Sequence, residues 1–218
     1  MSSTLNFTSI DRGLSKIYVG LGWQAPESQS DNPNKQYDLD ATCFLLDATG
    51  KTRNQSDCIY FNQLTTPCGS VKHWGDDQYG GGGDDDERIE VDLAKLPSDV
   101  EKLVFVVSIY DAEIKFPPQK FGDIKKSYIR VVDQTTNKEL SRLDLKTDGR
   151  SESVIVFGEL YKKNGEWRIR TLGDSGGSSL PELAEKYGVV VDRDELNQYT
   201  KTQQEKYRAS NTAPLCKV

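Results

Sequence analysis

The segment SVIVFGELYKKNGEWRIRT, residues 153–171, carries a strong signal for a β-hairpin. Two runs rich in β-branched, aromatic and other apolar residues, 153–162 and 167–171, lie on either side of Asn164 and Gly165. Asn-Gly between two such runs is typical of a two-residue hairpin loop, because both residues tolerate the positive φ angles that this turn requires. The sequence therefore predicts a pair of antiparallel strands here.

Further β-rich runs occur along the chain and are separated by turn signals such as 47–50 and 133–137. The run 104–109 is almost wholly apolar, which predicts a central strand covered on both faces. Strands at this spacing, with few helical patterns between them, predict a mainly β fold. We expect a β-sandwich of two mostly antiparallel sheets, with a few short helices and a C-terminal helical tail. The other expected strands are 17–21, 41–46, 58–61, 88–91, 103–110, 128–132 and 139–144.

Helical signals gather near the C-terminus. A short helix is predicted over 180–187, because Ser179 is placed to cap it, Pro181 fits its first turn and Gly188 can end it. The segment 192–209 is polar and compatible with a helix, but it carries little apolar periodicity.

The chain has 218 residues and a net charge of −6. This length suits one domain with an appendage, and we expect a β-sandwich domain over residues 1–191 and a polar extension over 192–218 that is helical and then flexible. The acidic charge argues against nucleic acid as a partner. No apolar run approaches the roughly 20 residues of a membrane-spanning helix. The N-terminus also lacks a signal-peptide pattern. We therefore expect a cytoplasmic protein without direct membrane insertion.

The four cysteines, Cys43, Cys58, Cys68 and Cys216, form no CxxC pair. Cys43 and Cys58 lie in apolar, strand-like runs, so we expect buried free thiols. The single histidine, His73, is predicted to lie in a loop. A histidine-rich zinc site or a Ser-His-Asp triad is therefore not available.

The segment GDDQYGGGGDDDERIEVDL, residues 75–93, sets four glycines against four consecutive acids, Asp84–Glu87. A phosphate-binding loop needs a lysine and a Ser or Thr after its last glycine, whereas an acid follows here. A hard cation such as Ca²⁺ takes six to eight oxygen ligands, and glycines let the chain turn several oxygens toward one point. The spacing from Asp76 to Glu87 matches an EF-hand loop only in part, and a β-like run follows it.

A second acidic pair supports a cation site. Asp38 and Asp40 point to the same side if this segment is extended; they precede an apolar strand, as Asp111 follows one. Two interpretations stay open from these residues alone: a calcium site, and a solvated acidic loop with ordinary turn residues at 38 and 40. Glycosidase-type acid/base work by paired carboxylates suits this crowded, glycine-rich loop less well than metal ligation.

A set of short segments, spread from about residue 17 to residue 191, keeps a recognisable order and spacing. These segments are 38–47, 61–62, 75–77, 80–87, 109–112, 121–122, 129–132, 157–161 and 165–167. Together they resemble the TerD family of tellurite-resistance and general stress proteins, which also includes slime-mould proteins described as cAMP-binding.

The resemblance implies a β-sandwich that binds one or two Ca²⁺ ions in acidic loops at one end, has no catalytic activity and acts in resistance to tellurite and other stress. It implies protein partners in a stress-response or tellurite-resistance complex. The alternative is a sensor that binds a small ligand such as a cyclic nucleotide. The metal ligands implied at matching positions are Asp38, Asp40, Asn62, Asp76, Gly80, Gly82, Asp85, Asp86 and Glu87, with Asp77, Asp84 and Asp111 as further candidates.

The chain also departs from the family pattern. Asp77 stands where the family usually has Asn, and Gly83 and Asp84 stand where it usually has Asp and then Gly. Which of Asp77, Asp84, Asp85 and Asp86 contact metal is left open by these departures.

Overall fold

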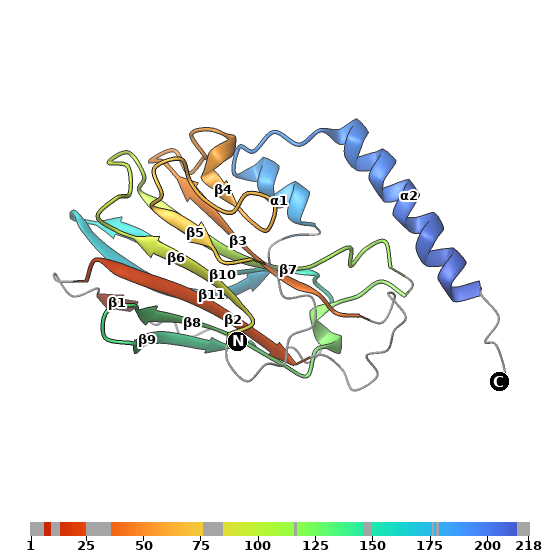
Figure 1. Ribbon diagram of the computed structural model, residues 1–218, viewed down its shortest axis with the longest axis horizontal. Helices are drawn as coiled ribbons and strands as arrows, with labels where there is room; N and C mark the ends of the chain where they lie inside the picture. The colour runs from red at the N-terminus through yellow and green to blue at the C-terminus, as the bar shows by residue number, and fades with distance from the viewer. Residues whose placement is uncertain are drawn as a thin grey trace.

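The computed structural model describes residues 7–9, 14–24, 36–75, 85–115, 117–145, 150–175, 177 and 179–212. In this part of the chain two antiparallel sheets pack face to face as a β-sandwich (Figure 1), which confirms the predicted fold class. The six-stranded sheet has the order β1-β11-β10-β7-β3-β4, and the five-stranded sheet has the order β5-β6-β2-β8-β9. The strands are β1 (Phe7–Ser9), β2 (Lys16–Gln24), β3 (Leu39–Leu46), β4 (Cys58–Ile59), β5 (Val71–His73), β6 (Glu87–Asp92), β7 (Lys102–Ile109), β8 (Lys126–Asp133), β9 (Lys138–Asp144), β10 (Val154–Lys163) and β11 (Glu166–Ser175).

The predicted hairpin is present as β10 and β11. Lys163 and Glu166 form its last pair, and the two loop residues, Asn164 and Gly165, have φ angles of 55° and 77°. Positive φ at both positions is the geometry for which Asn-Gly is favoured. The hairpin then pairs through β10 with β7, which confirms that the apolar run 104–109 belongs to a central strand.

The six-stranded sheet is covered on both faces, and this explains why β3 is buried along its whole length. Alternate residues such as Ala41 and Cys43 belong to the core between the sheets. Their neighbours Phe44 and Leu46 belong to a second cluster on the outer face, together with residues of the short helix α1 (Leu180–Lys186). Strand residues alternate between faces, so each set has its own partners.

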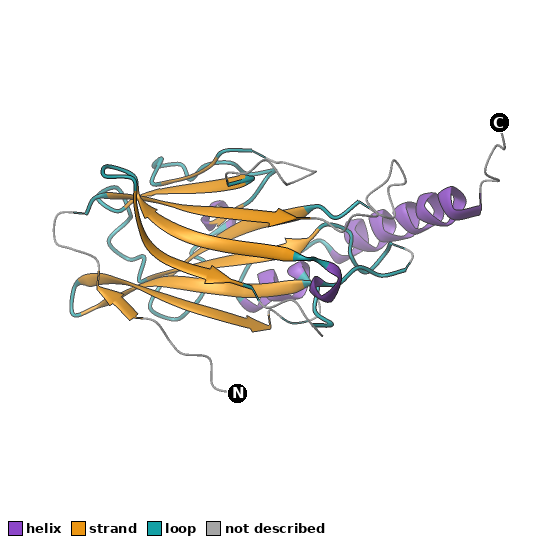
Figure 2. Ribbon diagram, turned by 90° about the horizontal axis from the view of Figure 1, so that it is seen from below, coloured by secondary structure: helices purple, strands orange, loops and turns teal. Residues whose placement is uncertain are grey.

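Helix α1 begins and ends as its sequence predicts. The hydroxyl of Ser179 accepts a hydrogen bond from the backbone N–H of Glu182, and Gly188 follows the helix with a φ of 92°. The longer helix α2 (Arg193–Thr212) extends past one end of the sandwich in both views (Figures 1 and 2). No helix in the described part of the chain is long and apolar enough to cross a membrane.

Two features of the fold differ from the prediction or were missed by it. Strands β1 and β5 were not predicted, because three-residue strands carry too little periodicity. His73 was predicted to lie in a loop, and this is wrong: it is the last residue of β5 and is 1% exposed.

The prediction of buried free thiols at Cys43 and Cys58 is confirmed. Short 3-10 turns occur at Gln55–Asp57 and Phe121–Asp123.

Candidate functional site

The predicted metal ligands that the structure describes do not form one cluster. The sandwich divides them among the outer face of the five-stranded sheet, the interior, and the end beside α2. Asp76, Asp77, Gly80, Gly82 and Asp84 lie outside the described residues. Their assignment as ligands therefore stays a prediction.

Asp85 lies against the outer face of the five-stranded sheet. Its carboxylate accepts hydrogen bonds from Arg130 Nε at 2.8 Å and Nη2 at 2.9 Å, and from the Tyr128 hydroxyl at 3.1 Å. Such a two-point arginine pair fixes the geometry of a carboxylate. Gly20 makes room for it, because a Cβ at residue 20 would lie 2.2 Å from Asp85 Oδ2. Burial and the nearby Asp85 raise the pKa of Tyr128 to about 12.

Asp86 and Glu87 are turned toward other parts of the sandwich. Asp86 Oδ2 accepts a hydrogen bond from the backbone N–H of Trp23 at 2.8 Å. Glu87 points into the interior, where its Oε2 accepts the backbone N–H of Ala41 at 2.5 Å and lies 3.6 Å from His73 Nε2. The side chains of Glu87 and His73 are both 0% exposed.

His73 completes this interior contact. Its Nδ1 accepts the backbone N–H of Gly75 at 3.1 Å, so its ring proton is on Nε2, which lies 3.2 Å from the carbonyl oxygen of Ala41. Strand β4 pairs only with Cys43 and Phe44 of β3. The two side chains from β5 and β6 thus satisfy the backbone of Ala41 where β4 does not reach. Sequence reasoning missed this role, because the contact joins residues 32 and 46 positions apart.

Asp111 lies at the third place, directly after β7. It has a φ of 54°, a conformation that Asp tolerates better than most residues. Its carboxylate accepts hydrogen bonds from the hydroxyl of Tyr199 at 3.0 Å and from that of Tyr207 at 3.1 Å, both on α2. Burial raises the pKa of Asp111, while the two tyrosine hydroxyls and the positive charge of Lys115 act in the opposite direction.

Lys115 connects Asp111 with the two acids that precede β3. It is 3% exposed, and its ammonium group donates hydrogen bonds to the Gln36 carbonyl at 2.9 Å and to Gln119 Oε1 at 3.1 Å. Burial lowers its pKa, and the negative charges of Asp38, Asp111 and Asp40 oppose that shift. The structure therefore brings these three predicted ligands into one electrostatic neighbourhood, and the protein supplies one positive charge of its own to it.

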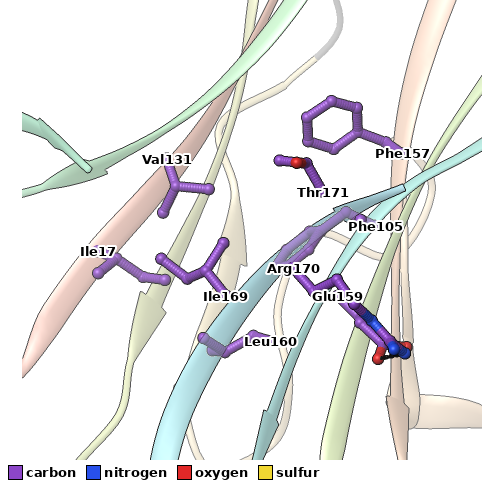
Figure 3. Close-up of a pocket in the computed structure, with 10 residues that line it drawn as sticks. Ile17, Phe105, Val131, Phe157, Glu159, Leu160, Ile169, Arg170 and Thr171 are labelled. Atoms are coloured by element: carbon purple, nitrogen blue, oxygen red, sulfur yellow. Dashed lines mark hydrogen bonds and ion pairs between the residues drawn. The ribbon is translucent and has the colours of Figure 1, made fainter. Parts of the chain in front are cut away.

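A cavity of about 620 Å³ opens at this end of the sandwich. Three of the predicted ligands, Asp40, Asn62 and Asp111, line it together with residues of α1 and α2. A second hollow, drawn in Figure 3, lies between the sheets, where Ile17, Val131 and Ile169 approach one another. It has room for about 10 Å³, which is about the space of one water molecule. It is therefore not a ligand site.

Within the residues that the structure describes, no three or more His, Cys, Asp or Glu side chains are arranged to hold a metal ion. These residues can therefore supply only part of a ligand set. Sequence reasoning missed three side chains of this end: Lys115, Tyr199 and Tyr207. The spacing of the two tyrosines, eight residues apart in a polar helix, was the available signal, because it places both on one helix face.

The protein is thus an antiparallel β-sandwich with a cavity at one end that several carboxylates line. The family model described as the TerD domain matches residues 2–187, and the chain belongs to the TerD family of tellurite-resistance and stress-response proteins. Helix α2 lies beyond the matched residues.

Relatives support this assignment. General stress protein 16U of Bacillus subtilis (strain 168) is 40% identical over 187 residues, which cover 86% of this chain and 94% of that protein. The tellurium resistance protein TerD of Serratia marcescens is 40% identical over 176 residues, which cover 81% of this chain and 88% of that protein. The crystal structure of a homologue of telluride resistance protein TerD from Streptomyces coelicolor A3(2) shares the fold, with a TM-score of 0.61 and 16% identity over 82% of this chain and 100% of that one.

Proposed function

We propose that this chain is a calcium-binding, non-enzymatic stress-response protein of the tellurite-resistance type, acting in the cytoplasm with protein partners of that response. Calcium would order the acidic loops at the end of the sandwich where Asp38, Asp40 and Asp111 gather. The observation that carries this proposal is that Asp40 and Asp111 line one cavity, with Asp38 acting with them on the charge of the buried Lys115. Family membership supports the stress-response part.

The side chains at this end fit a hard cation. Asp40, Asn62 and Asp111 offer carboxylate and amide oxygens to the cavity, and such oxygens are the ligands that Ca²⁺ prefers. Burial raises the pKa of Asp111, which means that its negative charge is unfavourable there. A bound divalent cation would supply positive charge that offsets this cost.

We further propose that the consecutive acids Asp84–Glu87 have different roles. Asp85, Asp86 and Glu87 hold the start of β6 through Arg130, the backbone of Trp23 and the backbone of Ala41. These contacts would leave metal binding to other residues, among them those of the segment 76–84. The remaining oxygen ligands would come from that segment, in particular from Asp76, Asp77, Gly80, Gly82 and Asp84.

A cyclic nucleotide is a less suitable ligand for this end of the molecule. The cavity is lined by Asp40, Asp111, Glu113 and Glu182, against one arginine, Arg193. Arg193 is paired with Glu185 through its Nε at 2.7 Å. Carboxylates repel a phosphate and attract cations, so the electrostatics favour Ca²⁺.

Calorimetric titration of chelator-treated protein tests the proposal. We expect heat of Ca²⁺ binding and a higher melting temperature, because a ligand that binds only the folded state stabilises it by roughly 3 kcal/mol at 100 times its Kd. The double variant Asp38→Asn/Asp40→Asn should bind at least about tenfold more weakly, since both carboxylates lose their charge. Glu139→Gln, on β9 of the other sheet, is the matched control and should bind like the wild type. An absence of heat up to millimolar Ca²⁺, with an unchanged melting temperature, would exclude the calcium site.

A further inference from the structure

The outer face of the six-stranded sheet carries a further cavity, of about 420 Å³. It lies beside the 620 Å³ cavity that Asp40 and Asp111 line. It is lined mainly by apolar side chains, among them Phe44, Ala184 and Val191. Tyr60, Leu180 and Pro181 line both cavities, so the two adjoin. We call them together the outer groove. Each of the two volumes lies in the range of sites for small organic ligands.

Strand β3 gives the outer groove a gradient of polarity. Phe44, Thr42 and Asp40 are alternate residues, so they share the outer face of the strand. Phe44 and Thr42 line the apolar cavity, and Asp40 lines the polar one. A strand rises roughly 3.3 Å per residue, so the distance along β3 from Phe44 to Asp40 is roughly 13 Å. A ligand that lies along these three residues of β3 is therefore elongated, with one apolar end and one polar end.

Thr42, the middle one of these three residues, has a hydroxyl group that lacks a hydrogen-bond partner among the described residues. Thr42 is 1% exposed. Buried polar side chains in native structures nearly always have a partner, so an exception calls for one. A donor or acceptor on a ligand in the groove would supply it.

The polar end of the outer groove suits a positively charged nitrogen. Asp40, Asp111 and Glu113 contribute carboxylates, and the rings of Phe61 and Tyr110 meet edge to face with centroids 5.9 Å apart. Aromatic faces beside carboxylates are the surroundings in which proteins bind organic ammonium ions. A hydroxyl near the nitrogen further favours an ammonium that still carries N–H donors over a quaternary one.

We propose that the outer groove binds an elongated organic cation: a primary or secondary amine, protonated, with an apolar chain or ring. Its ammonium group lies among Asp40, Asp111 and the aromatic rings and donates to the Thr42 hydroxyl, and its apolar part lies against Phe44 and α1. This site goes beyond calcium binding. It shares Asp40 and Asp111 with the proposed calcium site, so the two ligands compete.

The probe for this site is 4-phenylbutylammonium, titrated by calorimetry into the full chain in the presence of a calcium chelator. Its neutral and anionic counterparts, 4-phenylbutanol and 4-phenylbutyrate, are measured in the same way. We expect saturable binding of the amine, and binding at least tenfold weaker for the alcohol and the acid. Equal affinity of the amine and the alcohol would overturn the proposed role of the carboxylates.

Variants locate the site. Thr42→Val keeps the shape of the side chain and its strand preference but removes the hydroxyl, and it should weaken amine binding about tenfold. Thr135→Val, in the exposed turn after β8, is the matched control and should change nothing. Asp40→Asn should weaken both amine and Ca²⁺ binding, whereas Thr42→Val should leave Ca²⁺ binding unchanged. Amine binding that is insensitive to both Thr42→Val and Asp40→Asn, or no amine binding at millimolar concentration, would overturn the proposal. Amine binding without Ca²⁺ binding would uphold it and reject the calcium site alone.

Discussion

Glu87 is a fully buried carboxylate and Asp111 a partly buried one, and they belong to different kinds of site. Glu87 is held by groups of the sandwich itself: the backbone N–H of Ala41 on β3 and the ring of His73 on β5. Asp111 is held by the hydroxyls of Tyr199 and Tyr207 on α2. No residue of α2 from 193 to 209 is fully buried. The first carboxylate is therefore part of the core, and the second can exchange its partners.

Acids of the first kind contribute to stability, and acids of the second kind are available for binding. An acid whose partners lie on packed strands cannot move without opening the sandwich, because the surrounding interior is close-packed. An acid whose partner is a surface helix can be uncovered by local opening, which costs much less than global unfolding. Three variants test this contrast.

Glu87→Ala should give the largest effect, a loss of about 3 kcal/mol in the free energy of unfolding. It leaves the backbone N–H of Ala41 buried without its acceptor and opens a cavity beside His73. Unfolding in denaturant measures the loss. Glu87→Gln keeps an oxygen that can accept from Ala41 and is the matched control, for which we expect less than about half the loss. Equal losses would mean that the oxygen that accepts from Ala41 is not the source of the stabilisation. A complete loss of Ca²⁺ binding in a still-folded Glu87→Gln would place Glu87 with the binding acids instead.

The double variant Tyr199→Phe/Tyr207→Phe should affect α2 and its contacts with Tyr110 and Asp111, but not the core of the sandwich. It removes the hydroxyls that donate to Asp111, and hydrogen bonds to charged groups contribute roughly 1.5–3 kcal/mol each, less where water replaces them. We expect amide hydrogen exchange in α2 to become about tenfold faster, with the denaturation midpoint nearly unchanged.

Tyr161→Phe is the control for that pair, because its ring lies on β10, away from α2. It should leave exchange in α2 unchanged. If the double variant instead lowers the global stability by as much as Glu87→Ala, α2 is an integral part of the sandwich and the contrast fails.

Much of the fold could be predicted from the sequence, because its signals are local. Asn164 and Gly165 specify a hairpin through their own φ preferences, and Ser179 and Gly188 mark the ends of α1 through capping. The roles of the acids could not be predicted in this way. By strand alternation Asp85 would share a face with Glu87, but the chain bends at Asp86 and sends the two to opposite sides of the five-stranded sheet.

That bend is held by contacts that no sequence pattern announces. The backbone N–H of Asp86 donates to the Leu21 carbonyl, and its carboxylate accepts from Trp23 on the same strand. The burial of Lys115 is equally nonlocal, because its partners Gln36 and Gln119 lie in irregular segments. Such contacts depend on how the two sheets and their loops assemble.

Lys115→Met should give the smallest effect, and it tests the role of Asp111 in binding. The charge of Lys115 faces Asp38, Asp111 and Asp40, so its removal should tighten Ca²⁺ binding about threefold to tenfold, since a like charge near the ion is lost. Lys120→Met, at an exposed position, is the matched control and should leave the affinity unchanged.

The same variant should change the pH dependence of stability. Burial lowers the pKa of Lys115 below its usual 10.5, so between the folded-state pKa and 10.5 the unfolded chain binds more protons than the folded one. The lowered pKa of Lys115 therefore destabilises the folded protein at neutral pH. This destabilisation disappears as the pH rises from the folded-state pKa to 10.5. Unfolding measured from pH 7 to pH 10 should show the stability of Lys115→Met relative to the wild type falling as the pH rises. A constant difference over this range would mean that the pKa of Lys115 is not lowered in the folded protein, and that burial does not oppose its charge.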